Sequence, residues 1–392
     1  MSTIEVFEKS LRDRGYDPVS EDLSASDVLD ALESTLLIQK DYHRLFDALL
    51  IRVRVSLHLP VTKPTSLADV PADAEQAFRS AYMAAARKVG QHFLNDGRLA
   101  DAWAYFRTIG EPEAVRRAIE AVQIPTEPDA AFDEVLNLAL YEGAHVVRGL
   151  EFLLKTHGTC NTITAMSQLM PQMTQDERRR AAAMMVKHLY TDLQYSLARD
   201  VTARGGSVPD GTSIASMLSS GVSVFEGGNY HIDVSHLHAT VGFARHLRHG
   251  DSELELAREL AMYGGNLSSQ LRYPADVPFD DYYTASLHFL NALAGHETDQ
   301  AFAYFVDRLR NEPDAPDQRL IAFVLIDLGQ RIGRLEQALE IGGEHLSRLE
   351  DPSGFSFSTC CVEAGRTDLL EQNARRNDDV LGLVTSLLSK SK

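Results

Sequence analysis

Residues 85–112 read AARKVGQHFLNDGRLADAWAYFRTIGEP, and this stretch decides the expected fold class. Small and apolar residues recur at helical spacing on both sides of a turn marked by Gly97, and Pro112 opens the next element. The residues that carry the pattern are Gly90, Phe93, Leu99, Ala102 and Phe106. A helical hairpin of this kind cannot bury its apolar face alone, so the stretch predicts a stack of such hairpins.

The composition is that of an ordinary globular protein. The chain has 392 residues, of which 44% are hydrophobic and 24% are charged, and its formal net charge is -18. An acidic surface repels phosphate backbones and anionic lipid headgroups. We therefore expect no nucleic acid and no membrane among the partners.

The sequence also indicates the cellular compartment in which the protein is expected. The three cysteines, Cys160, Cys360 and Cys361, form no C-x-x-C motif and no disulfide framework. The N-terminal residues lack the apolar stretch of a signal peptide, and no run of eighteen apolar residues occurs. A soluble protein in the reducing cytoplasm is the expectation.

Helical periodicity continues through most of the chain. It covers 28–57, after which a Pro-rich polar stretch at 59–73 predicts a loop. Thr174-x-x-Glu177 is a capping box that opens a long helix to about Ala203. The sequence RGGSVPDGTS follows, and it divides the expected organisation into an N-terminal helical array at 1–204, a loop at 205–230 and a C-terminal helical-repeat half at 231–392.

Two later stretches repeat the first pattern. Gly333, Leu335 and Ala338 stand at the spacing of Gly97, Leu99 and Ala102, and the spacing returns once more at Gly365, Thr367 and Leu370. Residues 85–112 and 318–352 resemble degenerate tetratricopeptide repeats, although the tryptophan and tyrosine positions of that family are mostly absent. The resemblance implies an all-α protein, an α-solenoid of stacked helical hairpins, which usually contacts protein partners.

Histidines gather in one segment. Five of the fourteen histidines lie in residues 230–250, YHIDVSHLHATVGFARHLRHG. Asp233 is a natural N-cap for a helix that runs to about Arg248, which places His236 in the first turn and His231 just before the cap. These three residues are the predicted ligand-binding site, a polar pocket at the start of a helix.

The chemistry of that pocket has two interpretations. Asp233 is either a simple cap beside packed polar residues, or it joins the imidazoles in binding a divalent metal. Glu142-x-x-His145, with both residues on one helix face, resembles half of a carboxylate-bridged di-metal site, and Asp233-x-x-His236 is a candidate partner. The candidate metal ligands are Glu142, His145, His231 and His236. We expect no resident cofactor, with the divalent metal as the alternative.

Other signatures of chemistry are absent. The chain has no G-x-x-x-x-G-K-[ST], no G-x-G-x-x-G after a strand, no G-x-S-x-G and no H-E-x-x-H. The run Arg178-Arg179-Arg180 follows the capping-box glutamate and predicts a solvated helix face. The favoured function is a helical-repeat protein that binds a protein or peptide partner on a concave face. The alternative is an enzyme or ligand-binding protein with its pocket at His231, Asp233 and His236.

Overall fold

The polypeptide is built from helices. The computed structural model describes residues 2–16, 24–209, 211–346 and 356–390. Within these ranges there are nineteen α-helices, four short 3-10 helices and no strand, which confirms the expected all-α class. In the same ranges, no helix combines the length and the apolar character that a bilayer span requires.

The chain divides into two compact units, Met1–Thr156 and His157–Lys392. The division falls inside α8 (Val146–Leu169), close to Gly158, which has φ 81° and ψ -179°. Glycine tolerates this backbone conformation because it has no Cβ. The hydrogen-bonded helix is therefore interrupted at the border of the two units.

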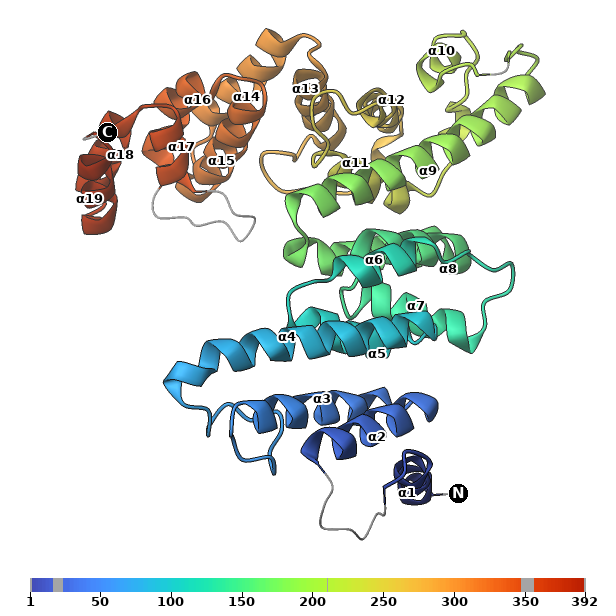
Figure 1. Ribbon diagram of the computed structural model, residues 1–392. Helices are drawn as coiled ribbons and strands as arrows, with labels where there is room; N and C mark the ends of the chain where they lie inside the picture. Colours follow the sequence, from blue (N-terminus) through green and yellow to red (C-terminus); the bar gives the residue numbers. More distant parts are fainter. Residues whose placement is uncertain (1, 17–23, 210, 347–355, 391–392) are drawn as a thin grey trace. The chain divides into compact units, whose positions relative to one another are not determined.

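The first unit is a succession of helices. They are α1 (Thr3–Asp13), α2 (Ala25–Ile38), α3 (Tyr42–Ser56), α4 (Ala72–Asn95), α5 (Leu99–Thr108), α6 (Glu113–Glu120) and α7 (Ala130–Leu140), followed by the first part of α8. From α1 to α6 each helix packs on the next, and α5 also contacts α7 (Figure 1). Side-chain oxygens accept backbone N–H groups at four of the helix starts and so fix them. The capping residues are Ser2, Ser24, Asp41 and Asp129.

The helical periodicity over 28–57 belongs to two helices. Lys40 has a positive φ of 55°, and the Asp41 carboxylate accepts the backbone N–H of Arg44 at 3.2 Å. A short polar side chain that caps a new helix competes with continuation of the old one. The apolar spacing continues on both sides of this break, so the periodicity alone does not detect it.

The hairpin of α4 and α5 depends on a close approach at Gly90. A Cβ at this position would lie 2.7 Å from Cε2 of Phe106, closer than packed atoms allow. Phe93 and Ala102 are fully buried, and Phe106 is 2% exposed. Gly97 forms the turn with φ 74°. The residues that carry the pattern in the sequence are therefore the packing residues of the hairpin.

A buried arginine organises the Pro-rich loop after α3. The side chain of Arg54 is fully buried. It donates from Nη1 to the Pro60 carbonyl at 2.7 Å, from Nε to the Pro64 carbonyl at 3.0 Å, and from Nη2 to the Ser66 carbonyl. Asp69 accepts from Nη1 at 3.1 Å and from Nη2 at 3.0 Å, which neutralises the charge. The predicted loop is therefore closed around one guanidinium group.

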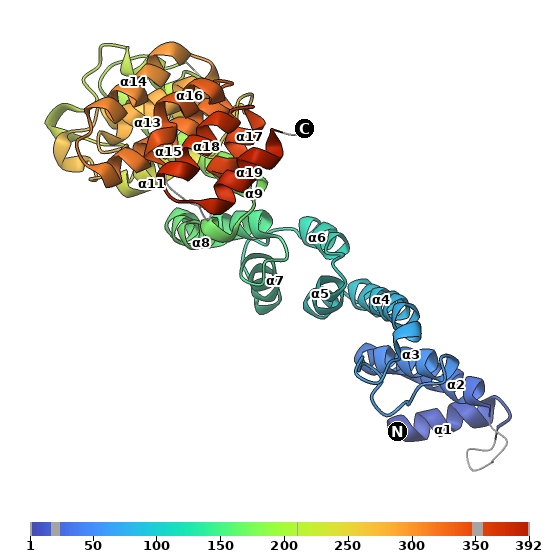
Figure 2. The same cartoon turned by 90° about the vertical axis from the view of Figure 1, so that its left-hand side faces the viewer.

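The second unit contains the remaining helices. They are α9 (Gln175–Ala203), α10 (Ile214–Leu218), α11 (Val234–Ala244), α12 (Glu253–Gly265), α13 (Tyr282–Ala294), α14 (Thr298–Asn311), α15 (Ala315–Arg331), α16 (Leu335–Gly342), α17 (Phe357–Glu363), α18 (Thr367–Arg376) and α19 (Val380–Ser389). The 3-10 helices are η1 (Met170–Gln172), η2 (Glu226–Gly228), η3 (Ser269–Leu271) and η4 (Gly343–His345). From α11 to α16 each helix contacts the next, and α13 also contacts α11 and α15; Figure 2 shows α13 to α19 gathered together.

Two helix starts of this unit match the sequence analysis. The capping box of Thr174 and Glu177 is formed, and α9 ends at Ala203 as predicted. Asp233 caps α11, but this helix ends at Ala244 and not near Arg248. The backbone N–H groups of Arg245, His246 and Leu247 bond to carbonyls three residues back, so the chain tightens into turns after Ala244.

The segment 205–230 is not simply a loop. It contains α10, capped by Ser213, and it contains η2. Ile214 is fully buried and Met217 is 1% exposed, and α10 contacts α9 and α12. Burial of these two apolar side chains explains why a short helix forms within a sequence rich in Gly, Pro and Ser. The segment lies in the second unit, and a domain boundary there stays a prediction.

We expect Ala102→Arg to destabilise the first unit. Arginine places a charge and a much larger side chain in a fully buried contact. The free energy of unfolding should therefore fall by about 2–4 kcal/mol. Urea unfolding followed by circular dichroism measures the midpoint. The matched control is Ala104→Arg on the exposed side of the same helix, which should leave the midpoint nearly unchanged. Equal midpoints for the two variants would contradict the packing role of Ala102.

Candidate functional site

Asp233 is the N-cap of α11. Its Oδ1 accepts the backbone N–H of Ser235 at 2.8 Å, the Ser235 hydroxyl at 2.5 Å and the backbone N–H of His236 at 3.2 Å. These bonds, with that from the Ser235 hydroxyl the strongest, lower the pKa of Asp233. The carboxylate is exposed, and His236 beside it is half-buried. Both residues therefore stand at the start of the helix, as the sequence predicts.

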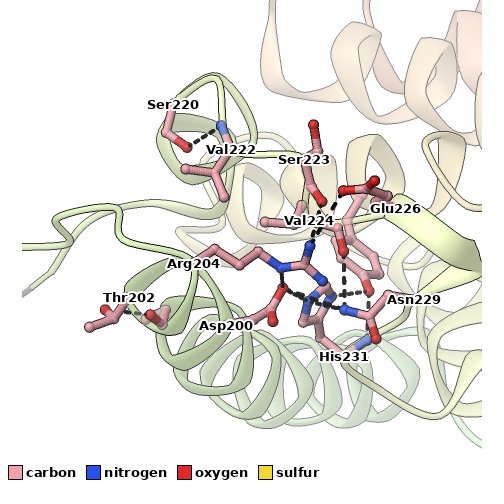
Figure 3. A network of polar contacts seen from close by, with 12 residues as sticks. Asp200, Thr202, Arg204, Ser220, Val222, Ser223, Val224, Glu226, Asn229 and His231 are labelled. Atoms are coloured by element: carbon pink, nitrogen blue, oxygen red, sulfur yellow. Dashed lines mark hydrogen bonds and ion pairs between the residues drawn. The ribbon is translucent and has the colours of Figure 1, made fainter.

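His231 belongs to a different network. Its ring contacts Asp200 on α9 through Nε2, which lies 3.1 Å from Oδ2 (Figure 3). Its Nδ1 lies 2.9 Å from the phenol oxygen of Tyr263 on α12. The His231 backbone N–H also donates to Tyr263 at 2.9 Å. The side chain is only 4% exposed. Both ring nitrogens are engaged inside the protein, and among the described residues their hydrogen-bond partners are Asp200, Tyr263 and Asn229 and not Asp233 or His236.

Asp200 is the centre of that network. It accepts from Arg204 Nε at 2.7 Å and from Asn229 Nδ2 at 3.4 Å, in addition to its contact with His231 (Figure 3). Burial alone would raise the pKa of Asp200, but the bonds from His231 and Arg204 lower it overall. Arg204 also donates to the Ser223 carbonyl at 3.0 Å. The network therefore fastens the chain before α11 to the end of α9.

The other candidate metal ligands lie in the first unit. Glu142 and His145 occupy the turn between α7 and α8, where Gly143 has φ 74°. The expected shared helix face is therefore absent, because the positive φ ends the helix before His145. Glu142 is exposed, whereas His145 is buried with Nε2 at 3.1 Å from Glu120.

The structure contains no evident metal centre in its described part. Among these residues, no group of three or more His, Cys, Asp and Glu side chains is placed to hold a metal ion. Glu142 and His145 belong to one unit, while His231 and His236 belong to the other. A divalent metal stays the alternative interpretation of the histidine-rich segment.

A cavity of about 700 Å³ lies in the second unit, and the C-terminal part of the histidine-rich segment contributes to its lining. Its walls come from α9, from the end of α11 and the turn after it, and from the α13, α15 and α17 regions. None of His231, Asp233 and His236 lines it; the histidines that do are His246 and His249. One part of the wall is apolar, with Phe279, Phe289, Phe323 and Val324.

Basic side chains also line the cavity, and two of them, Arg245 and Arg331, lie over the Phe279 and Phe289 rings. Four arginines line it, together with the two histidines, and the acidic residues of the lining are Asp327 and Glu363. The basic members are Arg178, Arg245, Arg248 and Arg331. Burial, reinforced by the guanidinium groups of Arg331, Arg178 and Arg245, lowers the pKa of His246 to about 4. The imidazole is therefore neutral at pH 7, and three positive charges lie near it.

The arginines of this cavity were not predicted from the sequence. Of the run predicted as a solvated face, only Arg180 is exposed. Arg178 is 7% exposed and donates to the carbonyls of Met170 and Pro171 at 2.8 and 3.1 Å. Arg179 forms a paired contact with Asp251, at 2.7 Å from Nη2. The periodicity of α9 contains the signal for Arg178, which stands three residues before the buried Ala181.

Comparison with known proteins assigns no function to this geometry. No protein-family model matches the chain, and no curated protein matches it. The function is therefore argued from the arginine-lined cavity and from the helical hairpins themselves.

We expect Asp233→Asn to be nearly neutral for folding. Asparagine keeps the oxygen that accepts the N–H groups of Ser235 and His236, so the free energy of unfolding should change by less than about 0.5 kcal/mol, whereas Asp233→Ala should cost about 1 kcal/mol. Chemical denaturation of both variants measures the difference. A cost for Asp233→Asn equal to that for Asp233→Ala would show that the charge, and not only the cap, holds the segment together.

We expect Asp200→Asn to lower stability by about 1–3 kcal/mol at pH 7. The folded-state pKa of Asp200 is lowered, so its ionised form stabilises the fold above the unfolded-state pKa of about 3.9, and the contribution is lost as the pH falls through the lower, folded value. Unfolding of both proteins between pH 3 and pH 7 should therefore show a difference that shrinks in acid. The control is Asp192→Asn on the same helix, an exposed ion pair worth under about 1 kcal/mol. A difference that does not vary with pH would contradict this role.

Proposed function

We propose that this chain is a helical-repeat protein, similar to tetratricopeptide proteins, that binds a protein or peptide partner. We propose further that a segment of the partner docks in the cavity of the second unit. The observation that carries the proposal is the cavity itself, which combines apolar and basic side chains. Its volume of about 700 Å³ lies within the range of 300–1,000 Å³ that is usual for ligand pockets.

Three turns that precede equivalent helix starts support the repeat interpretation, and each has the geometry common to glycine helix ends in this chain. Gly97, Gly333 and Gly365 have φ of 74°, 74° and 68°, and an arginine follows each of them. In all three, this arginine's backbone N–H bonds to the carbonyl five residues earlier, at 2.7–2.9 Å, as in a Schellman helix end. The three bonds are Arg98 to Phe93, Arg334 to Gly329 and Arg366 to Cys361.

The helices after these turns bury equivalent positions. Each begins two residues after the glycine, at Leu99, Leu335 and Thr367. The residue three positions further on is buried in every case: Ala102 and Ala338 fully, and Leu370 to 2% exposure. Contacts that run mainly between helices close in sequence, as from α11 to α16, are also typical of stacked hairpins.

The apolar wall gives the partner a place to bury side chains. Phe279 and Phe289 are largely buried and form a fixed surface, whereas Val324 is only half-buried and offers accessible apolar area. Aromatic and aliphatic pockets of this kind account for most of the affinity in peptide recognition. A partner segment with one or two apolar residues fits this surface.

The alternative is an enzyme or ligand-binding protein with its pocket at His231, Asp233 and His236. The engagement of both His231 ring nitrogens by Asp200 and Tyr263 favours the docking function over this alternative. We also propose a cytoplasmic location, because Cys160, Cys360 and Cys361 are free thiols, as is usual in a reducing compartment.

We expect Val324→Trp to block docking. A random peptide library displayed on phage is selected on the immobilised full chain, and the enriched peptides are synthesised and measured by calorimetry. Tryptophan at position 324 adds a large ring at the apolar part of the lining and obstructs it, so the affinity for these peptides should fall at least about tenfold. Circular dichroism verifies that the variant is folded.

The matched control is Leu320→Trp on the same helix. Leu320 is 49% exposed and does not line the cavity, so the added ring should leave peptide affinity within about twofold of the unmodified protein. Failure to enrich any peptide would contradict the proposed function. So would enriched peptides that bind the Val324→Trp variant as tightly as the unmodified chain.

A further inference from the structure

The basic lining of the cavity contrasts with the rest of the protein. The chain carries a formal net charge of -18, yet four arginines and two acidic residues line this one space. Arg248 and Glu363 are exposed, so water screens them. Arg331 lies 3.2 Å from Asp327. The charges that determine the character of the cavity are therefore those of Arg178 and Arg245.

Neither of these two arginines has a carboxylate partner within ion-pair distance in the described part of the chain. Arg178 donates from Nε and Nη2 to the carbonyls of Met170 and Pro171, which leaves Nη1 for a ligand. Arg245 donates from Nε to the Gly242 carbonyl at 3.2 Å. Backbone carbonyls orient both guanidinium groups without neutralising them.

An aromatic face also holds Arg245. Its guanidinium carbon lies 3.9 Å from the centroid of the Phe279 ring, a cation–π contact. Burial lowers the pKa of Arg245, which means that the surroundings disfavour its charged form. Because arginine stays protonated in proteins, its unpaired charge lowers the stability of the fold until an anion binds beside it.

His246 lines the same cavity as the two arginines. Burial, together with the charges of Arg331, Arg178 and Arg245, lowers the pKa of His246, so its ring is neutral at pH 7. The neutral imidazole can donate one hydrogen bond to an anion without adding a further charge. The geometry thus combines planar guanidinium donors and a neutral donor in a single cavity.

We propose that the cavity binds a dianionic phosphate monoester, presented by a phosphorylated residue of the partner, between Arg178 and Arg245 at His246. This assignment rests on the proposed docking function. Two positive charges without carboxylate partners, one buried at Arg178 and one half-buried at Arg245, match the charge of about -2 on a phosphate monoester, whereas one carboxylate neutralises only one of them. Arginine forks also match the geometry of phosphate oxygens. The neighbouring phenylalanines receive the apolar part of the same segment.

The first test uses small aromatic probes whose polar groups carry different charges. Phenyl phosphate, phenylacetate and benzyl alcohol share an aromatic ring and carry about two, one and no negative charges at pH 7.5. Calorimetry on the full chain at low salt should show phenyl phosphate binding at least about tenfold more tightly than phenylacetate, with benzyl alcohol weakest. Equal affinities for the three probes would overturn the proposal.

Arg245→Met is the decisive variant, because methionine keeps the apolar contact with Phe279 and removes the charge. Phenyl phosphate should bind it at least about tenfold more weakly, while Arg245→Lys, which keeps the charge without the fork, should be intermediate. The matched control is Arg180→Met on α9, which removes the same charge from an exposed position and should change affinity less than about twofold. Thermal unfolding verifies each fold; without ligand, Arg245→Met should be at least as stable as the unmodified chain.

A further experiment with peptides tests the phosphate assignment separately from the proposed docking function. Degenerate peptide libraries with a fixed phosphoserine, a fixed glutamate or a fixed serine are compared on the same protein. The phosphoserine library should be retained at least about tenfold better than the serine library, and Arg245→Met should abolish the difference. Peptides that bind at the cavity regardless of charge would overturn the phosphate assignment and leave docking intact. Phenyl phosphate binding through Arg245 with no peptide retained would instead overturn docking by a protein partner.

Discussion

Close contact between the backbone of one helix and the side chain of the next is the constraint on which the architecture depends. At Gly90 on α4 a methyl group would overlap the Phe106 ring of α5, and at Gly329 on α15 it would lie 2.5 Å from Cβ of Ala338 on α16. At Gly264 on α12 it would overlap the Tyr283 ring of α13. Each contact sets the separation of two consecutive helices. The position of the cavity depends on this packing, because each helix that lines it is held in place by its neighbours.

The local chemistry of the chain was sufficient to predict the helices and many of their ends. Thr174 and Glu177 form the expected capping box, and Asp233 caps α11, since both signals act within four residues. The break at Lys40 escaped prediction because leucines continue at helical spacing on both sides of it. The end of α11 was placed too late because no Gly or Pro marks residues 245–249, where the chain leaves the helix.

The sequence placed the candidate site at His231, Asp233 and His236, and it gave no indication of the cavity that other residues of the same segment line. Histidine density drew attention to 230–250, and this segment does supply His246 and His249 to the cavity. His231 instead pairs with Asp200 and Tyr263, which stand 31 and 32 residues away in the sequence. Arg178 and Arg245 meet only through folding, so spacing in the sequence carries no sign of their shared cavity. A non-local arrangement of single charges is the kind of feature that periodicity does not reveal.

The hydrogen bonds that Arg54 donates to the loop after α3 have a consequence for protein engineering. The segment after α3 is rich in proline and polar residues, and many of its side chains are exposed, so it looks suitable for inserting a tag or for opening new chain ends. Its carbonyls at Pro60, Pro64 and Ser66 converge on one buried guanidinium, together with the Asp69 carboxylate. An insertion between Pro60 and Asp69 would separate these acceptors and strand a charge in the interior. Tolerance to insertion is therefore governed by the internal bonding of a loop and not by its surface exposure.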